Sequence, residues 1–456
     1  RTLISTLFRA YWDERHVPTC LKDSITILLH KKGPATDVSN YRPIALANAL
    51  FKAFTKTVTV IMEAYVEESG LHPASQNGFR PQRGTRDAVR LVVSALEDAI
   101  LTASSIHVTY IDYSDAFGSV PHDGLFRVML AQGFPDDIVE VVRAIYKGVA
   151  TRVATPHGLT EPIPVGVGTL QGDVLSPALW GVFLAPLLRW LEVGARGYTL
   201  KTSDNSVESS AYADDMALLS SSRTDSRLQL TKVAQYAEWA GLKVNLSKCA
   251  YTALIDGKRT RSPKHAAPLH FTARTGTPLE DGAYVPWLPS DQPYSYLGVD
   301  LTATLQWNHD LHNLQEKVNT RAAKLLRSPY SIRQRLILLS ENIVSGAAYK
   351  AVAGGYTPAH TATVDRKVAG HAKRIVRAPH GYAGAFVYLP RDLMGMGVRR
   401  FSSIVAETYL QDMCYFLHQP DTPVGAITRG LLQEHLRRGG ETSLEGTLRL
   451  RKTYAS

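Results

Sequence analysis

Two adjacent acids, Asp214 and Asp215, lie inside the otherwise apolar, strand-like run of residues 211–219. Neighbouring carboxylates are costly there, because like charges repel and loss of solvent disfavours the charged form of each. A divalent cation is the usual compensation. A third acid, Asp112, directly follows the β-rich run of residues 106–111. Two strands that bring carboxylates to one place are typical of two-metal phosphoryl or nucleotidyl transfer, although a hairpin with an acidic tip would also explain the adjacent pair alone.

The size and composition of the chain are those of a globular protein. Its 456 residues, 45% hydrophobic and 20% charged, suffice for two or three domains with their own cores. Cys20, Cys249 and Cys414 lie far apart and form neither a metal-ligand spacing nor a disulfide framework, so a reducing, intracellular compartment is expected. The longest apolar segment, residues 179–188, is too short to span a bilayer, and no membrane partner is expected. Because the chain starts without Met in helix-like sequence, we expect a piece of a longer protein.

The net charge of +10 is concentrated in the last third of the chain. Residues 301–456 hold 21 Lys and Arg against 11 Asp and Glu, whereas residues 1–300 hold 30 of each kind. A basic region beside an acidic, metal-ready one indicates a polyanionic partner, with nucleic acid first. A solvated basic surface would explain the charge equally well.

Hydrophobic periodicity and turn residues predict a mixed α+β chain. We expect strands at 24–30, 41–47, 106–111 and 249–254, strand fragments near 153 and 163–167, and an acidic hairpin around residues 214 and 215. We expect helices at 48–68, from a Thr85 cap to 99, at 121–132, 135–147, 175–193 and 226–240, and from 311 onward. Residues 255–290, rich in Pro, Gly, Arg and Lys, are expected to form a loop or irregular insertion.

The order of seven motifs resembles the reverse transcriptase domain of non-LTR retrotransposons, the long-interspersed-element type, over about residues 21–400. In chain order the motifs are NYRPIAL at 40–46, QNGFR at 76–80 with RGTRDA at 83–88, DYSDAF at 112–117, LQGDVLSP at 170–177, YADD at 212–215, GLKVN at 241–245 with Ser247 and Lys248, and YLG at 296–298. One departure is Gly118, which stands where many such elements carry an acid. That acid is not a metal ligand, so we expect no loss of chemistry.

The resemblance implies a right-hand polymerase with an antiparallel-sheet palm. We expect fingers at 1–105, a palm at 106–300 with interleaved fingers segments at about 121–165, and a basic helical thumb with a C-terminal extension at 301–456. The resemblance implies RNA-directed DNA synthesis from an RNA template, a DNA primer and dNTPs. It also implies an intracellular location, which is the nucleus if chromosomal DNA is the primer. The alternatives are a group II intron maturase, a telomerase-like enzyme, or a non-catalytic RNA-binding scaffold. A scaffold could lose its acids freely, yet all three remain.

The resemblance also assigns the metal ligands. Asp112 and Asp214 are expected to bridge two Mg²⁺ ions, and oxygen-only ligands suit that ion. Asp215 is the third acid of the catalytic set, or else a carboxylate outside the ligand shell or merely solvated.

Five residues are expected around the incoming nucleotide. Arg42 offers a planar fork to the triphosphate, or else pairs structurally with an acid. Lys31, in the same hairpin, is expected to help Arg42 bind the triphosphate, or else to be a solvated turn residue. Gln171 and Gly172 expose backbone to the nascent base pair, or cap a helix. Lys248 protonates the pyrophosphate, or is solvated.

The remaining expected site residues concern the sugar and the nucleic acid. Phe117 would block the 2′-hydroxyl of the incoming sugar, or else pack in the core. Tyr296, Leu297 and Gly298 resemble the primer grip. Basic residues with helical spacing would follow the phosphate backbone of a template–primer duplex: Arg321, Lys324, Arg327, Lys373, Arg374 and Arg377.

Overall fold

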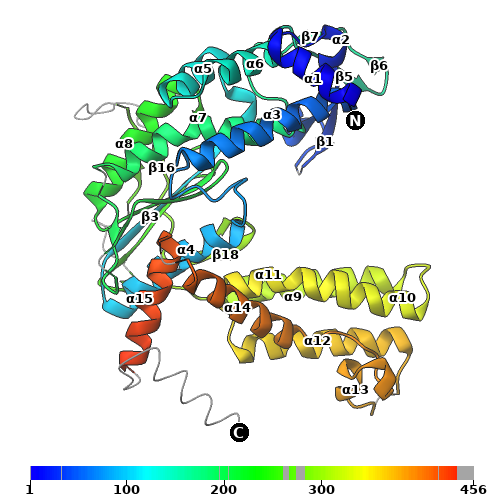
Figure 1. Ribbon diagram of the computed structural model, residues 1–456. Helices are drawn as coiled ribbons and strands as arrows, with labels where there is room; N and C mark the ends of the chain where they lie inside the picture. Colours follow the sequence, from blue (N-terminus) through cyan, green and yellow to red (C-terminus); the bar gives the residue numbers. More distant parts are fainter. Residues whose placement is uncertain are drawn as a thin grey trace.

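The computed structural model describes residues 2–31, 33–194, 196–203, 205–259, 267–273, 283–379, 381–419 and 421–438. Its ribbon forms a C (Figure 1). The upper arm holds α1, α3, α5 and α6, the lower arm holds α9 to α14, and the sheet around β3 joins them. This arrangement of fingers, palm and thumb confirms the predicted right-hand α+β fold. Parts of the predicted insertion, at 260–266 and 274–282, and the C-terminal residues 439–456 lie outside the described residues.

The fingers are built on a small mixed sheet. Its strands are β1 (Ser24–His30), β2 (Tyr41–Ala47), β5 (Ala150–Thr155), β6 (Gly158–Leu159) and β7 (Ile163–Pro164), in the order β2-β1-β5-β6 with β7 also on β5. β1 and β2 form an antiparallel hairpin, and β5 pairs parallel to β1. The surrounding helices are α1 (Thr2–Asp13), α2 (Thr19–Lys22), η1 (Val38–Asn40), α3 (Ala49–Glu68), α5 (His122–Ala131) and α6 (Asp136–Tyr146).

A buried lysine ties α2 to the end of α6. The Lys22 ammonium, 4% exposed, donates to the carbonyl oxygens of Ala144 at 2.6 Å and Lys147 at 2.8 Å. The last carbonyls of a helix have no partner within it, so this cation satisfies groups that would otherwise be left unpaired. Burial lowers the pKa of Lys22.

The palm contains a five-stranded antiparallel sheet with β3 (Ile106–Ile111) at its centre. The order is β10 (Ser209–Tyr212), β11 (Asp215–Ser220), β3, β13 (Ala250–Ile255) and β14 (Lys258–Arg259). Its helices are α4 (Thr85–Thr102), η2 (Phe117–Ser119), α7 (Leu175–Glu192) and α8 (Arg223–Ala240). Four two-stranded ladders flank the sheet: β4 (Tyr113–Ser114) with β12 (Lys243–Val244), β8 (Tyr198–Thr199) with β9 (Ser206–Val207), β15 (Leu269–His270) with β16 (Tyr284–Val285), and β17 (Tyr294–Tyr296) with β18 (Val299–Leu301).

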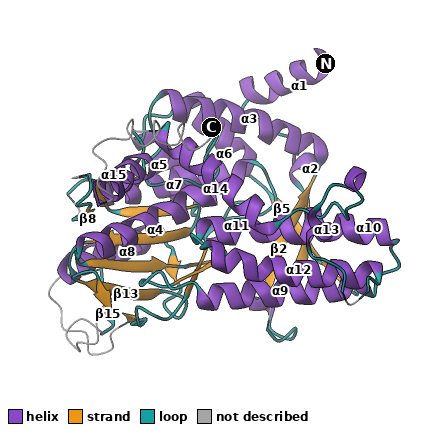
Figure 2. Ribbon diagram, turned by 90° about the horizontal axis from the view of Figure 1, so that it is seen from below, coloured by secondary structure: helices purple, strands orange, loops and turns teal. Residues whose placement is uncertain are grey.

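The central strand separates two hydrophobic cores. Every residue of β3 is buried, and alternate side chains of a strand point to opposite faces. Val108 and Tyr110 join the core that includes α4 and the thumb, whereas Ile111 joins the core that includes α7 and α8. Figure 2 shows the palm strands together with α4 and α8, and the thumb helices α9 and α12 beside them. Burial on both faces fixes the end of β3, and therefore the position of the residue that follows it.

The thumb is helical. It contains α9 (Asn308–Leu326), α10 (Ile332–Ile337), the π-helical η3 (Leu338–Val344), α11 (Ser345–Ala353), α12 (Pro358–Val376), α13 (Ala385–Tyr388), η4 (Arg391–Leu393) and α14 (Phe401–Leu417). The stretch 332–353 is long and apolar enough to cross a membrane by length and composition, but 56% of its apolar window is buried inside the fold, which is typical of a core helix.

The last helix, α15 (Pro423–Arg438), returns to the palm and packs on α4 (Figure 1). The preceding helix is anchored to the same α4 by Arg86. The Arg86 guanidinium lies 2.7 Å from Asp412 Oδ1 and 4.2 Å from the centre of the Tyr415 ring. The C-terminal helices therefore connect thumb and palm.

Three local expectations were wrong in detail. The cap of α4 is Gly84 rather than Thr85, and its N–H donates to the Asp87 carboxylate at 2.8 Å. The predicted helix at 226–240 starts at Arg223, because Ser222 accepts the N–H of Asp225 and caps it there. The described part of the predicted loop at 255–290 contains the short strands β14, β15 and β16.

A buried carboxylate joins the thumb helices to β18. Asp310, 0% exposed, accepts from the Lys350 ammonium at 2.8 Å, from the Asp300 N–H at 3.2 Å and from the Tyr356 hydroxyl. Removing the Asp310 carboxylate would be costly, because its buried partners would lose a hydrogen bond or an ion pair and could not bind water instead.

We therefore expect Asp310→Ala to reduce the free energy of unfolding by about 3 kcal/mol, since Lys350 would lose its closest acid. Chemical denaturation followed by circular dichroism measures this. The double variant Asp310→Leu with Lys350→Met should recover most of the loss, and Glu316→Ala, on the exposed side of α9, should change stability by less than about 0.5 kcal/mol. An Asp310→Ala variant as stable as the Glu316→Ala control would contradict the role of the cluster.

Candidate active site

The turn between β10 and β11 presents the two adjacent acids. Tyr212 pairs with Asp215 across the hairpin, so Ala213 and Asp214 form the turn. Ala213 has φ +56°, in the left-handed region that a non-glycine residue seldom adopts. On the other side, Met216 pairs with Ile111, the last residue of β3. The register thus brings Asp112 beside the hairpin turn, as the sequence predicted.

The acids interact through their charges. Loss of solvent, and then the charge of Asp112, raises the pKa of Asp214, while Arg42 and Lys248 oppose the shift. Loss of solvent, and then the charges of Asp214 and Asp112, raises the pKa of Asp215 to about 6. The Lys248 ammonium lies 3.4 Å from Asp112 Oδ2. Asp112, Asp214, Asp215, Arg42 and Lys248 therefore share one electrostatic neighbourhood, in which the negative charge is only partly offset.

The donor set fits a hard divalent cation. Carboxylate oxygens are the ligands that Mg²⁺ prefers, and this ion is usually held by one or two carboxylates together with waters and substrate phosphates. Among the described residues, no three His, Cys, Asp or Glu side chains converge into a complete cage. Asp112 and Asp214 could therefore hold part of a metal shell that a phosphate-bearing substrate completes.

The backbone around Asp112 is fixed by the segment between β12 and β13. The Asn245 N–H donates to Asp112 O at 2.8 Å, and the Asp112 N–H donates to the Cys249 sulfur at 3.4 Å. Burial raises the pKa of the Cys249 thiol to about 11. The thiol thus stays protonated near neutral pH while no metal ion is bound.

An aromatic cluster lies next to the acids. The Phe117 ring, half-buried, lies 5.5 Å from the Trp180 ring and 6.5 Å from the Phe79 ring, and Phe79 lies 6.1 Å from Tyr212. Phe117 is therefore packed on one side and open on the other, unlike a core phenylalanine. Phe79, with φ +58° and 45% exposed, was missed as a site residue. The sequence feature that could have indicated Phe79 is its place directly after Gly78 in the QNGFR motif.

The structure accounts for the departure at Gly118. A Cβ added there would lie 2.1 Å from Asp115 Oδ2. The carboxylate of Asp115 thus occupies the space that a side chain at 118 would need. Asp115 Oδ1 accepts from Gln171 Nε2 at 3.1 Å. An acid is therefore present beside Gln171 although it comes from a different position, and the sequence analysis did not single out Asp115.

The predicted glutamine–glycine pair contacts the fingers. The Ala45 N–H on β2 donates to Gln171 O at 2.7 Å. Gly172 has φ +109°, and a Cβ there would lie 2.9 Å from Ala45 O. Only glycine fits this conformation and this approach. Since the cap of α7 is Val174, the pair links fingers to palm rather than capping the helix.

The two predicted nucleotide-binding residues of the fingers hairpin differ in their surroundings. Arg42 is exposed on β2 opposite Leu29, and its charge acts on Asp214. Within the described part of the chain, no ion pair forms between Arg42 and an acid, so the alternative of a structural pair gains no support. Lys31 is an exposed residue at the hairpin turn, where its N–H donates to Asn40 O at 2.7 Å. Its alternative as a solvated turn residue stays open.

The predicted primer grip is the turn between β17 and β18. Leu297 and Gly298 have φ +49° and +83°, and Leu297 O accepts from the Tyr349 hydroxyl of α11 at 3.1 Å. The Tyr296 side chain is 2% exposed and donates to Ser210 O at 3.0 Å. Tyr296 thus supports the sheet, whereas Leu297 is half-buried and Gly298 is exposed.

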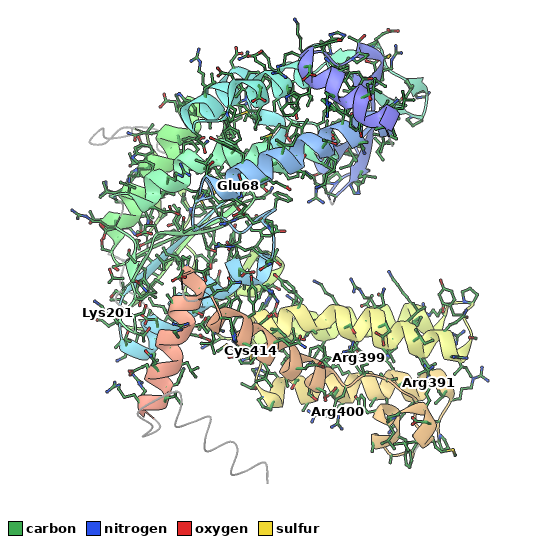
Figure 3. All side chains as sticks on the ribbon, in the orientation of Figure 1. Glu68, Lys201, Arg391, Arg399, Arg400 and Cys414 are labelled. Carbon is green, nitrogen blue, oxygen red and sulfur yellow. The ribbon has the colours of Figure 1, made fainter. Side chains whose placement is uncertain are left out.

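The predicted basic thumb residues lie on two packed helices, α9 and α12. All six are exposed or half-exposed: Arg321, Lys324, Arg327, Lys373, Arg374 and Arg377. Figure 3 labels three more arginines on this arm, Arg391, Arg399 and Arg400. All three already have partners: Arg391 Nε donates to Met396 O at 3.5 Å, Arg399 lies 3.9 Å from Glu341, and Arg400 lies 5.0 Å above the Tyr388 ring. The six predicted residues remain the better candidates for phosphate contacts.

Comparisons with known proteins agree with this geometry. Residues 29–301 match the family model described as reverse transcriptase (RNA-dependent DNA polymerase). The chain is 25% identical over 391 residues to the Pol polyprotein of the type-2 retrotransposable element R2DM from Drosophila melanogaster, covering 84% of this chain and 34% of that protein. It is 26% identical over 329 residues to the RNA-directed DNA polymerase from the mobile element jockey of the same organism, covering 71% and 33%.

The chain thus spans about a third of the length of the curated relatives that it matches. Among solved structures, it is similar to telomerase from Candida albicans with a fragment of telomeric RNA, at a TM-score of 0.44 and 10% identity over 94% of this chain and 66% of that one. At this TM-score and identity, the similarity is too weak to support a functional conclusion.

The crowding of the acids predicts a response to metal. Mg²⁺ at about ten times its Kd should stabilise the wild type by about 1.4 kcal/mol, and Asp214→Asn should lose this response. In metal-free buffer Asp214→Asn should melt at or above the wild-type temperature, because one repelling charge is gone. Thermal melts with and without Mg²⁺ measure both effects, with Asp13→Asn, an exposed acid on α1, as the control. A full Mg²⁺ response in a variant lacking both Asp112 and Asp214 carboxylates would place the metal elsewhere.

Proposed function

Since the chain belongs to the reverse transcriptase (RNA-dependent DNA polymerase) family, we propose that it extends the 3′-hydroxyl of a DNA primer with dNTPs while copying an RNA template, as part of a non-LTR retrotransposon protein. The observation that carries this proposal is that the register of β10, β11 and β3 places Asp112, Asp214 and Asp215 at one end of the palm sheet, where the charges of Arg42 and Lys248 act on Asp214. Carboxylates and cations in one place are what nucleotidyl transfer requires.

The chemistry assigned to the palm is metal-assisted. Two Mg²⁺ ions, when bound, would activate the primer hydroxyl and stabilise the charge on the pyrophosphate leaving group. Asp112 and Asp214 are the residues proposed to hold them. Asp215 adds negative charge at the turn and so strengthens the attraction of cations to it.

Basic side chains would act on the triphosphate. Arg42, on the exposed side of the fingers hairpin, provides two parallel N–H donors for phosphate oxygens. Lys31 would add a second cation at the end of the same hairpin. Lys248 offsets the charge of Asp112 at 3.4 Å in the structure. With substrate present, its ammonium could donate a proton to the leaving pyrophosphate.

The ring of Phe117 would select the sugar. It stands five residues after Asp112 and is held by Trp180 and Phe79 on its packed side. A rigid ring beside the sugar of a metal-bound nucleotide excludes a 2′-hydroxyl by steric repulsion. Gln171, held by Asp115, and Gly172 would border the nascent base pair.

The basic residues of α9 and α12 would follow the phosphates of the template–primer duplex, with the turn at Leu297 and Gly298 against the primer. A retrotransposon enzyme that primes on chromosomal DNA acts in the nucleus, and we propose that location. The relatives named for mobile elements support this origin over a maturase or a telomerase-like enzyme. The presence of all three acids argues against a non-catalytic RNA-binding scaffold.

Asp112→Asn or Asp214→Asn should lower primer extension on an RNA template at least about a thousandfold, because loss of metal charge stabilisation costs several kcal/mol in the transition state. Duplex affinity, measured by fluorescence anisotropy, should stay within about threefold, since the thumb supplies those contacts. Asp13→Asn serves as the control and should extend normally. Extension within tenfold of wild type would remove the substituted acid from the catalytic set.

Phe117→Val should raise the relative efficiency of ribonucleotide incorporation at least about tenfold, which is about 1.4 kcal/mol of discrimination, with a modest loss of deoxynucleotide use. Paired kcat/KM values for ribo- and deoxynucleotides measure the ratio. The control is Phe183→Val, which removes a fully buried ring 6.5 Å from the same Trp180 and should lower the melting temperature without changing the ratio. If Phe117→Val behaves like that control, Phe117 is a packing residue.

A further inference from the structure

A segment far from the catalytic turn in sequence lies along its strand. The Ala211 N–H on β10 donates to Ser75 O at 2.9 Å, and the Asn77 N–H donates to Ala211 O at 2.8 Å. Gln76 and Ala211 thus form a parallel bridge at the free edge of the palm sheet. The segment covers that edge immediately before the turn that carries Asp214.

The side chain of Gln76 reaches the turn itself. Its amide is buried, with the residue 2% exposed, and Oε1 accepts the N–H groups of both Ala213 at 3.0 Å and Gly78 at 2.8 Å. Nε2 donates to Ala213 O at 3.3 Å. One amide therefore binds both the N–H and the carbonyl of Ala213, the residue with positive φ. A non-glycine residue in this region costs about 1–2 kcal/mol, so it persists only where the surroundings hold it.

The segment is rigid enough to act as a clamp. A Cβ on Gly78 would lie 2.3 Å from Ala213 N, so this close approach requires glycine. Arg80 Nη1 donates to the carbonyls of Pro73 and Gln76, each at 3.3 Å. Arg83 Nη1 donates to Ala74 O at 3.1 Å. Gly78 and Arg80 of the QNGFR motif, together with Arg83 just after it, thus hold the segment of Gln76 against the turn.

We propose that Gln76 is a positioning residue for catalysis: by binding the backbone of Ala213 it fixes the direction of the adjacent Asp214 toward Asp112, against the repulsion of the two carboxylates. This inference rests on the proposed function. Without the clamp, Ala213 can leave its strained conformation and the acids can move apart while no metal is bound. Bringing them together again would then consume part of the metal-binding free energy, so a higher Mg²⁺ concentration is required.

The test compares two buried glutamines that bind the same hairpin. Gln229 is 1% exposed, and its Nε2 donates to Leu219 O at 2.9 Å and Glu208 O at 3.2 Å, at the opposite end of β11 from the turn. Gln76→Met and Gln229→Met remove amides of equal size and burial. Both should lower the metal-free melting temperature, because each leaves backbone groups unpaired.

Only Gln76→Met should change the response to metal. We expect the Mg²⁺ concentration for half-maximal extension, and that for half-maximal thermal stabilisation, to rise about tenfold, or about 1.4 kcal/mol. We expect kcat to fall about tenfold or more, while KM for template–primer stays unchanged. Gln76→Glu keeps the acceptor oxygen for both N–H groups and exchanges the amide donor for a buried carboxyl group, which is neutral when it is protonated at such a site. In that form the variant should fold and show an intermediate Mg²⁺ requirement. If Gln76→Met does not fold, Gln76→Glu carries the test.

The outcomes separate the two proposals. An unchanged Mg²⁺ requirement in the folded Gln76 variants, or an equal shift in Gln229→Met, would make Gln76 a purely structural residue and overturn the inference while primer extension by the wild type still stands. A wild type that extends no primer would instead overturn the proposed function. The thermal response to Mg²⁺ would then still report whether Gln76 controls the geometry of the acids.

Discussion

Three carboxylates that repel one another are held at one end of the palm sheet, and much of the surrounding structure keeps them there. Asp214 and Asp215 have raised pKa values because partial loss of solvent, and then the charges of neighbouring carboxylates, disfavour their charged forms. A flexible chain would separate these charges. Here β3 is buried on both faces between two cores, so its end, and with it Asp112, cannot move away without exposing apolar surface. Packing thus keeps the three negative charges close together, and their combined field can attract a cation.

The parts that would bind substrate are attached to this fixed point by backbone contacts. Gln171 O accepts from Ala45 in the fingers, and its side chain is held by Asp115, whose carboxylate fills the space left by Gly118. On the other side, Tyr349 of the thumb donates to the turn at Leu297. Fingers and thumb are therefore both attached to the palm, which allows one arrangement to position triphosphate, primer and metal together.

Much of the fold and site followed from the sequence, because local patterns carry them. The strands 24–30, 41–47 and 106–111 and the helices over α3, α5, α6 and α7 lie where periodicity predicted them. The resemblance to non-LTR reverse transcriptases is confirmed by the family match over residues 29–301 and by relatives named for such elements. The cap of α4 was misplaced, because Thr85 is a good capping residue in isolation, whereas Asp87 reaches back to the N–H of Gly84. Such competition between neighbouring caps depends on side-chain geometry that spacing does not reveal.

The sequence by itself determined the chemistry that this chain can offer: the acids, their delivery by two strands, and a basic C-terminal third. Each of these depends on residue type and on short-range spacing. Only the tertiary structure decided how the acids are held and what stands next to them. Gln76 is 137 residues from Ala213, Gln171 is 56 from Asp115, and Tyr349 is 52 from Leu297. The physical reason is that a hydrogen bond to backbone can be made by many residue types at any separation in the chain, so its partner is selected by packing of the whole fold rather than by a motif.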